Sequence, residues 1–94
     1  MTIKEFSERV HAETVEWVKR NYPSLDAERE ARVVIHNGRK YTRVDVGGSG
    51  KYMIDEAGNI YGIKAYGVPH FGHRYGTLET VDQYYWGGYV GAKK

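Results

Sequence analysis

Glycine and tyrosine are distributed unevenly along this chain, and this distribution restricts the fold more than any other feature. Residues 1–40 contain one of the 12 glycines and one of the nine tyrosines, whereas residues 41–94 contain all the others. Glycine favours turns, and tyrosine favours strands. We therefore predict helix in the first part of the chain and sheet in the second, within a single α+β domain that spans residues 1–94.

The first 22 residues have the pattern of an amphipathic helix. Thr2 and Glu5 have the spacing of a capping box, in which each side chain bonds the backbone N–H of the other residue. Apolar side chains then recur every three or four residues as far as Val18. We expect the helix to end at Tyr22, because a residue that precedes proline, here Pro23, disfavours helical backbone.

Two hairpin patterns follow a short second helix, which we predict over residues 27–31. The first hairpin covers residues 32–46 and turns at Asn37-Gly38, a pair typical of tight hairpin turns. The second covers residues 51–66. Together they predict a four-stranded antiparallel sheet with the N-terminal helix packed on one face. Beyond residue 66 we expect an irregular segment rich in glycine and tyrosine.

The charge balance gives little information about a partner. The net charge is +2, and neither end of the chain is a basic arm or an acidic tail. The chain has no cysteine, which excludes disulfides, thiolate catalysis and cysteine-bound zinc. No stretch has the length and apolar character of a signal peptide or a membrane span. We therefore predict a cytoplasmic protein that does not contact a membrane.

The densest polar cluster of the chain contains His70, His73 and Arg74. Two imidazoles can act as acid and base in the cleavage of a phosphate ester while a guanidinium holds the anion. Two histidines supply at most half of a metal site, so this hypothesis is a metal-independent hydrolase or nuclease without a cofactor. The simpler interpretation, which we favour, is that both histidines are loop residues with hydrogen bonds to the backbone.

The second half of the chain carries more aromatic surface than a core of this size can enclose. Basic residues lie on or beside the same predicted strands, an arrangement suited to protein hot spots and to the stacking of single-stranded nucleic acid. The alternative is that about half of the tyrosines complete the core with their hydroxyls at its edge. The candidate binding residues are Arg39, Tyr41, Arg43, Tyr52, Tyr61, Tyr66, Tyr75, Tyr85 and Trp86.

Three sequence runs carry a resemblance to a known group of proteins. They are residues 51–55, residues 58–67, and a third run that begins at His70 and continues through residues 72–78. These runs resemble small uncharacterised proteins found in bacteriophage and mobile-element genomes, and the resemblance covers about residues 41–89. It implies a phage or plasmid setting and assigns no catalytic residue.

Taken together, these patterns predict a small noncatalytic binding module with a tyrosine-rich, mildly basic surface. A protein partner, including a second copy of the chain, is slightly favoured over single-stranded nucleic acid because the net charge is close to zero. The alternative prediction is the hydrolase or nuclease that uses His70, His73 and Arg74.

Overall fold

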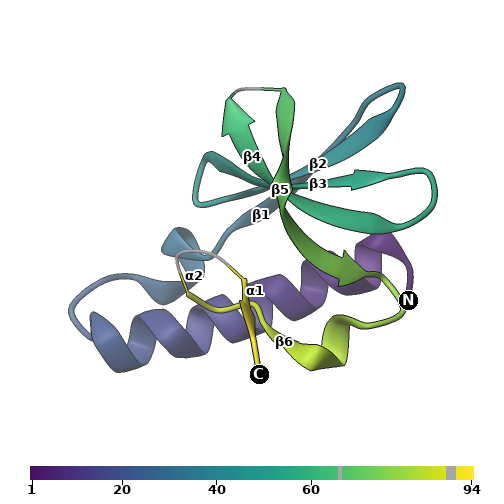
Figure 1. The fold of residues 1–94 in the computed structure, drawn as a ribbon. Helices are drawn as coiled ribbons and strands as arrows, with labels where there is room; N and C mark the ends of the chain where they lie inside the picture. The colour runs from purple at the N-terminus through teal and green to yellow at the C-terminus, as the bar shows by residue number, and fades with distance from the viewer. Residues whose placement is uncertain (66, 89–90) are drawn as a thin grey trace.

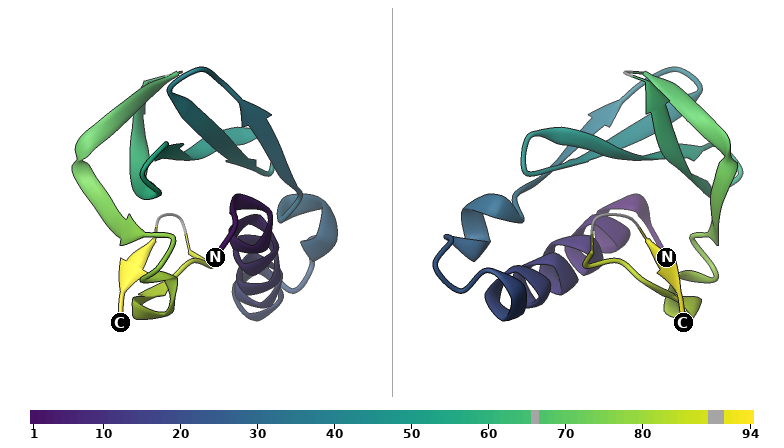
Figure 2. Two further views of the ribbon diagram at one scale, coloured as in Figure 1. Left: turned by 90° about the vertical axis from the view of Figure 1, so that its right-hand side faces the viewer. Right: turned by 60° about the vertical axis from the view of Figure 1, so that its left-hand side comes forward.

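The protein is an α+β domain in which an antiparallel sheet arches over a long helix (Figures 1 and 2). The computed structural model describes residues 1–65, 67–88 and 91–94. The helices are α1 (Ile3–Asn21) and α2 (Ala27–Glu30). Five strands form the main sheet in chain order: β1 (Val33–Asn37), β2 (Tyr41–Val46), β3 (Ser49–Asp55), β4 (Asn59–Ala65) and β5 (Val68–Thr77).

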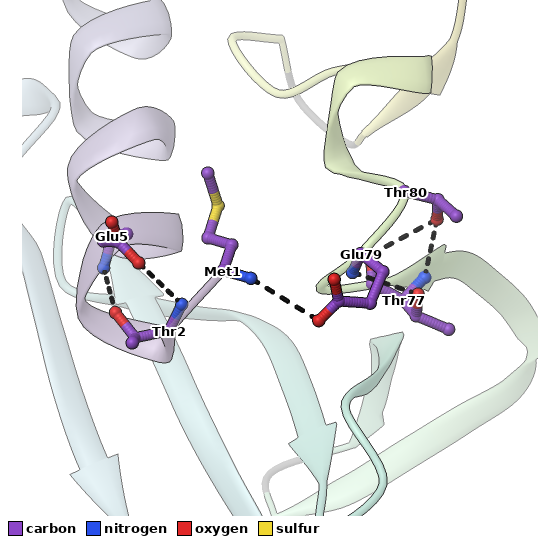
Figure 3. Close-up of polar contacts among 6 residues, drawn as sticks. All are labelled: Met1, Thr2, Glu5, Thr77, Glu79 and Thr80. Carbon is purple, nitrogen blue, oxygen red and sulfur yellow. Dashed lines mark hydrogen bonds and ion pairs between the residues drawn. The ribbon is translucent and has the colours of Figure 1, made fainter.

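The capping box at the start of α1 is confirmed (Figure 3). The Glu5 N–H donates to Thr2 Oγ1 at 3.1 Å, and the Thr2 N–H donates to Glu5 Oε1 at 2.9 Å. The hydrogen bond from the Thr2 backbone lowers the pKa of the Glu5 carboxyl group below its usual value. The second helix is also present, and Asp26 caps it by accepting a hydrogen bond from the Arg29 N–H.

The two predicted hairpins are present, but the first does not turn at Asn37-Gly38 as predicted. Asn37 pairs with Thr42 inside the ladder, so the turn lies at residues 38–41, where the Gly38 N–H donates to the Tyr41 carbonyl at 3.0 Å.

The connection between the two hairpins is itself a tight turn. Val46 pairs with Ser49, so Gly47 and Gly48 alone connect β2 to β3. Both glycines have positive φ, 62° and 88°, as a two-residue type I′ turn requires. The sheet therefore continues from the first hairpin into the second without a break.

The pairing of β2 with β3 contains a bulge that decides which side chains enter the core. Asp45 pairs with Gly50, whereas the preceding residue of β2, Val44, pairs with Tyr52. Lys51 is therefore an additional residue in β3. Because successive strand residues face opposite sides, the bulge places Tyr52 on the same side of the sheet as Val44, facing α1.

The prediction of a four-stranded sheet was wrong, because the segment from Val68 to Thr77 forms a fifth strand at the sheet edge. Pro69 and two glycines within this segment had indicated irregular structure. An edge strand tolerates proline, and bulges absorb the extra residues. Arg74 pairs with Tyr61 while His70 pairs with the next residue of β4, Gly62, so residues 71–73 are additional in β5.

The last part of the chain closes the core from the side of β5. A 3₁₀ turn, η1 (Val81–Gln83), precedes β6 (Tyr84–Tyr85), which pairs with β7 (Ala92–Lys93). Figure 2 shows this segment beside α1 and beneath the arch. Arg9 of α1 forms an ion pair with Asp82 at 2.9 Å, and Glu13 accepts a hydrogen bond from the Trp86 N–H at 2.8 Å.

Aromatic rings fill the space between the arch and α1. Trp86, Tyr52 and Phe6 are fully buried and pack edge to face, with ring centroids 4.9–5.8 Å apart. The indole N–H of Trp86 donates to the Val81 carbonyl at 3.0 Å, so its polar atom is satisfied inside the core.

No helix in the described ranges is long and apolar enough to cross a membrane.

Candidate functional site

The face of the sheet that points away from α1 carries the candidate site, and we call it the outer face. A row of paired residues crosses it: Arg43 on β2 pairs with Met53 on β3, and Met53 pairs with Tyr61 on β4. The strand neighbours of Met53 belong to the core beneath the arch, so Met53 faces the other way. Met53 is nevertheless only 5% exposed, which means that other side chains cover it on the outer face.

Three rings form an aromatic cluster on this face: Tyr41, Tyr61 and Phe71, which we call the outer aromatic cluster. The Phe71 ring meets the Tyr61 ring at a centroid distance of 5.1 Å and lies 6.5 Å from the Tyr41 ring. Phe71 is 63% exposed and the two tyrosines are half-buried. The cluster therefore has an apolar residue at its most exposed point.

The bulge of β5 holds Phe71 in this position. It also brings His70 and His73 together, with their rings stacked at 4.1 Å and 20° from parallel. A side chain on Gly72 would place its Cβ only 3.0 Å from His70 Cε1, so a residue without Cβ suits the turn between the two rings. His70 Nδ1 is buried and has no hydrogen-bond partner within the part of the chain that is described. The expected hydrogen bond from this nitrogen to backbone is absent there.

Arg74 follows the stacked histidines but is occupied by a different contact. Its guanidinium donates to the side-chain oxygen of Asn59 at 2.6 Å, and its side chain is exposed. Within residues 1–65, 67–88 and 91–94, no three or more His, Asp or Glu side chains are grouped to hold a metal ion. The structure thus brings two of the three proposed catalytic residues into contact and ties the third to a neutral amide.

The cations near the outer aromatic cluster divide into two groups. Arg43 binds both carboxylate oxygens of Asp45, at 2.7 and 3.3 Å, and His36 Nε2 lies 3.1 Å from the same carboxylate. Arg39 and Lys40 are exposed at the turn between β1 and β2. The four basic residues line a hollow of about 300 Å³, and Tyr41 and Met53 line it as well.

Two of the predicted binding residues lie in the core and not on a surface. Tyr52 and Trp86 are fully buried, so they cannot contact a partner in this conformation. The bulge at Lys51 turned Tyr52 inward, and the C-terminal segment, whose course the sequence did not reveal, carries Trp86 beneath the arch. Burial raises the pKa of the Tyr52 hydroxyl above its ordinary value.

The remaining predicted residues divide between these two environments. Tyr75 packs edge to face against both Tyr52 and Trp86, and burial raises its pKa. Tyr85 is half-buried beside α1, where a side chain on Gly87 would collide with its hydroxyl. Tyr66 lies outside the described residues.

Sequence reasoning missed Phe71, the most exposed ring of the site. The available signal was a phenylalanine between His70 and Gly72, in a segment whose other residues are mostly polar, tyrosine or glycine.

The comparisons with protein families, with curated proteins and with solved structures found no match for this chain.

Proposed function

We propose that this chain is a noncatalytic binding module that recognises a protein partner through the outer aromatic cluster. The observation that carries the proposal is the exposure of Phe71, an apolar ring that the bulge of β5 holds against Tyr61. Aromatic side chains are enriched at protein interfaces, so an exposed phenylalanine ring in contact with two half-buried tyrosines supports a protein-binding role.

The contacts around the cluster favour a protein partner over single-stranded nucleic acid. Nucleic-acid binding needs cations that are free to meet phosphates. Here Arg43 and His36 share Asp45, and Arg74 bonds Asn59. A mixed surface of rings, paired charges and a few exposed cations matches the composition of protein hot spots.

The test compares Phe71→Ser with Leu25→Ser, which removes another exposed apolar side chain, 48% exposed, from the loop after α1. Self-association is measured by sedimentation equilibrium, and binding to other proteins by capture with the pure domain followed by titration of the captured protein. We expect Phe71→Ser to weaken the association at least about tenfold, as for other interface hot spots, and Leu25→Ser to leave it unchanged. Equal behaviour of the two variants would contradict the proposal.

Nucleic acid is the second outcome of the same comparison. Fluorescence anisotropy with an oligothymidylate probe at low and at physiological salt reports whether the domain binds a single strand. If wild-type protein binds the probe, loses it steeply as salt rises, and depends on Phe71, the partner class is single-stranded nucleic acid. If no binding occurs at low salt, that class is eliminated.

The hydrolase or nuclease hypothesis remains as the second candidate because the rings of His70 and His73 are in contact. In that case one of His70 and His73 would take a proton from the attacking water and the other would donate a proton to the leaving oxygen. Arg74 would have to release Asn59 to hold the phosphate. Hydrolysis of bis(p-nitrophenyl) phosphate by wild-type protein, His70→Ala and His73→Ala tests it. Turnover by the wild type that either substitution abolishes, with the melting temperature retained, would favour the enzyme over the binding module.

We also propose, from the resemblance over about residues 41–89, that the chain is encoded by a phage or another mobile element and acts in the host cytoplasm. This setting makes a host protein the first partner to examine. A gene neighbourhood without phage or plasmid genes, or recovery of the protein from a membrane or extracellular fraction, would count against it.

A further inference from the structure

A groove at the C-terminal half of α1 has the size and lining of a small-molecule site. Its volume is about 500 Å³, within the range of typical ligand pockets, roughly 300–1,000 Å³. Trp17, Val18 and Tyr22 of the α1 side line it, together with the exposed Leu25. The turn between β2 and β3 and the residues Gly87 and Gly88 complete the lining. This site shares no lining residue with the outer aromatic cluster.

Thr14 supplies the first polar group of this groove. Its side chain is only 5% exposed, and its Oγ1 has no hydrogen-bond partner among the residues that the structure describes. A buried hydroxyl without a partner has lost its hydration without compensation. Because Thr14 lines the groove, a bound molecule that offers a hydrogen-bonding atom would satisfy this hydroxyl.

Lys51 supplies the second polar group. It is the additional residue of β3, and its side chain lines the groove. Its ammonium group donates to the Gly88 carbonyl and retains two further donors. Burial lowers the pKa of Lys51 to about 8, so removal from water already disfavours its charge. A ligand anion in the groove would compensate for that loss of hydration.

We propose that this groove binds a small monoanionic molecule with an aromatic or branched apolar body, whose carboxylate meets Lys51 and Thr14. The apolar body of the ligand packs against Trp17 and Tyr22, whose rings meet edge to face at a centroid distance of 5.6 Å. Glu30 also lines the groove. Lys51 offers one positive charge to the ligand, and the Glu30 carboxylate disfavours a second negative charge on it.

The experiment uses 2-naphthoate as the probe and the neutral 2-naphthamide as its matched comparison. Binding to the full chain is followed by amide chemical shifts in ¹H–¹⁵N NMR spectra at pH 7. We expect 2-naphthoate to bind at least about tenfold more tightly than 2-naphthamide, as for a charge-assisted hydrogen bond. The largest shifts should lie at Thr14, Trp17, Lys51 and Gly88.

Two variants separate the polar contacts. Lys51→Met preserves the stem of the side chain, and we expect it to remove the preference for the anion while leaving the affinity for 2-naphthamide unchanged. Thr14→Val keeps the shape and removes the unpaired hydroxyl, so it should fold at least as stably as wild type and bind 2-naphthoate about fivefold more weakly. If Lys51→Met does not fold, Lys51→Gln provides the same comparison.

Phe71→Ser is the control outside the groove and should leave 2-naphthoate binding unchanged, so the groove and the outer aromatic cluster are tested separately. Equal affinity of wild-type protein for the two probes would overturn the proposal. So would shifts confined to residues outside the groove, or the absence of any shift at millimolar probe concentration.

Discussion

Lys51 illustrates how one residue can be placed by an irregularity of the sheet. As the extra residue of a bulge, its side chain leaves the alternation of β3 and enters the groove near α1, where its ammonium group loses water. Its neighbour Tyr52 goes to the core, where burial affects an acid in the opposite direction. Two adjacent titratable groups therefore respond to the same desolvation with pKa shifts of opposite sign.

The Lys51 shift predicts a pH dependence of stability. In the unfolded chain Lys51 has its ordinary pKa of 10.5, and in the folded protein the pKa is about 8. Between these values the unfolded state binds more protons, so the free energy of unfolding should rise with pH. Below about pH 8 the group is protonated in both states and adds no slope.

The measurement is urea denaturation of wild-type protein and Lys51→Met from pH 7 to pH 10.5. The wild type should gain stability relative to the variant above about pH 8. Tyr52 acts against stability above about pH 10, because only the unfolded chain then loses its phenolic proton, but both proteins keep Tyr52 and its effect cancels. A constant difference across this range would show that Lys51 is not desolvated.

Among the elements, the turn between β2 and β3 is the one whose geometry depends most directly on glycine. Gly47 and Gly48 both have positive φ, which L-residues adopt at a cost of roughly 1–2 kcal/mol. They differ in surroundings, because a Cβ on Gly47 would lie 2.6 Å from the Glu30 carbonyl oxygen, whereas a Cβ on Gly48 would meet nothing within 4 Å.

This difference makes the two glycines a matched pair. Gly48→Ala should destabilise the protein by about 1 kcal/mol through its backbone conformation alone. Gly47→Ala should cost at least about twice as much, because α2 or the turn must also move to relieve the contact. Urea denaturation measures both, and equal losses would mean that the close approach of the turn to Glu30 is not maintained in solution.

The same elements explain how much of the fold could be read from the sequence. Capping residues and turn glycines act locally, so α1, α2 and the first four strands were predicted with nearly their observed bounds. Bulges were not predictable, because an extra residue is recognised only from the partner strand. One bulge precedes Tyr52, which lies in the core and not on a binding surface, and the other lies in β5 and carries the exposed ring of Phe71.

Part of the candidate site was predictable for the same reason. Tyr41 and Arg43 share one parity on β2, so their common face followed from the alternation of side chains along the strand. Nothing in the sequence indicated that the segment after β5 would return beneath the arch. The assignment of Trp86 to a binding surface was therefore wrong, because its ring is fully buried.

For the whole molecule, stability depends on a ring contributed by the last part of the chain. Trp86 packs against Phe6 from α1 and Tyr52 from β3, so it connects helix, sheet and C-terminal segment. Trp86→Ala should cost about 3–5 kcal/mol, a large share of the roughly 5–15 kcal/mol available to a small domain.

The milder substitution Trp86→Phe separates packing from hydrogen bonding at this position. It retains a ring but leaves the Val81 carbonyl without its indole donor, so we expect a smaller loss, about 1–3 kcal/mol. Urea denaturation followed by near-ultraviolet circular dichroism reports both variants. A loss below 1 kcal/mol for Trp86→Ala would contradict the central role of this ring.

The additional residue in β3 has a consequence for changes in chain length. Removing one amino acid from a strand ordinarily exchanges its inner and outer side chains and destroys the fold. Excision of Lys51 would instead leave Tyr52 opposite Val44 in an uninterrupted ladder. We expect a 93-residue version that lacks Lys51 to fold and to melt cooperatively, whereas excision of Met53 should prevent folding. Natural selection could therefore shorten this strand at that one position and abolish the groove's cation without disturbing the core.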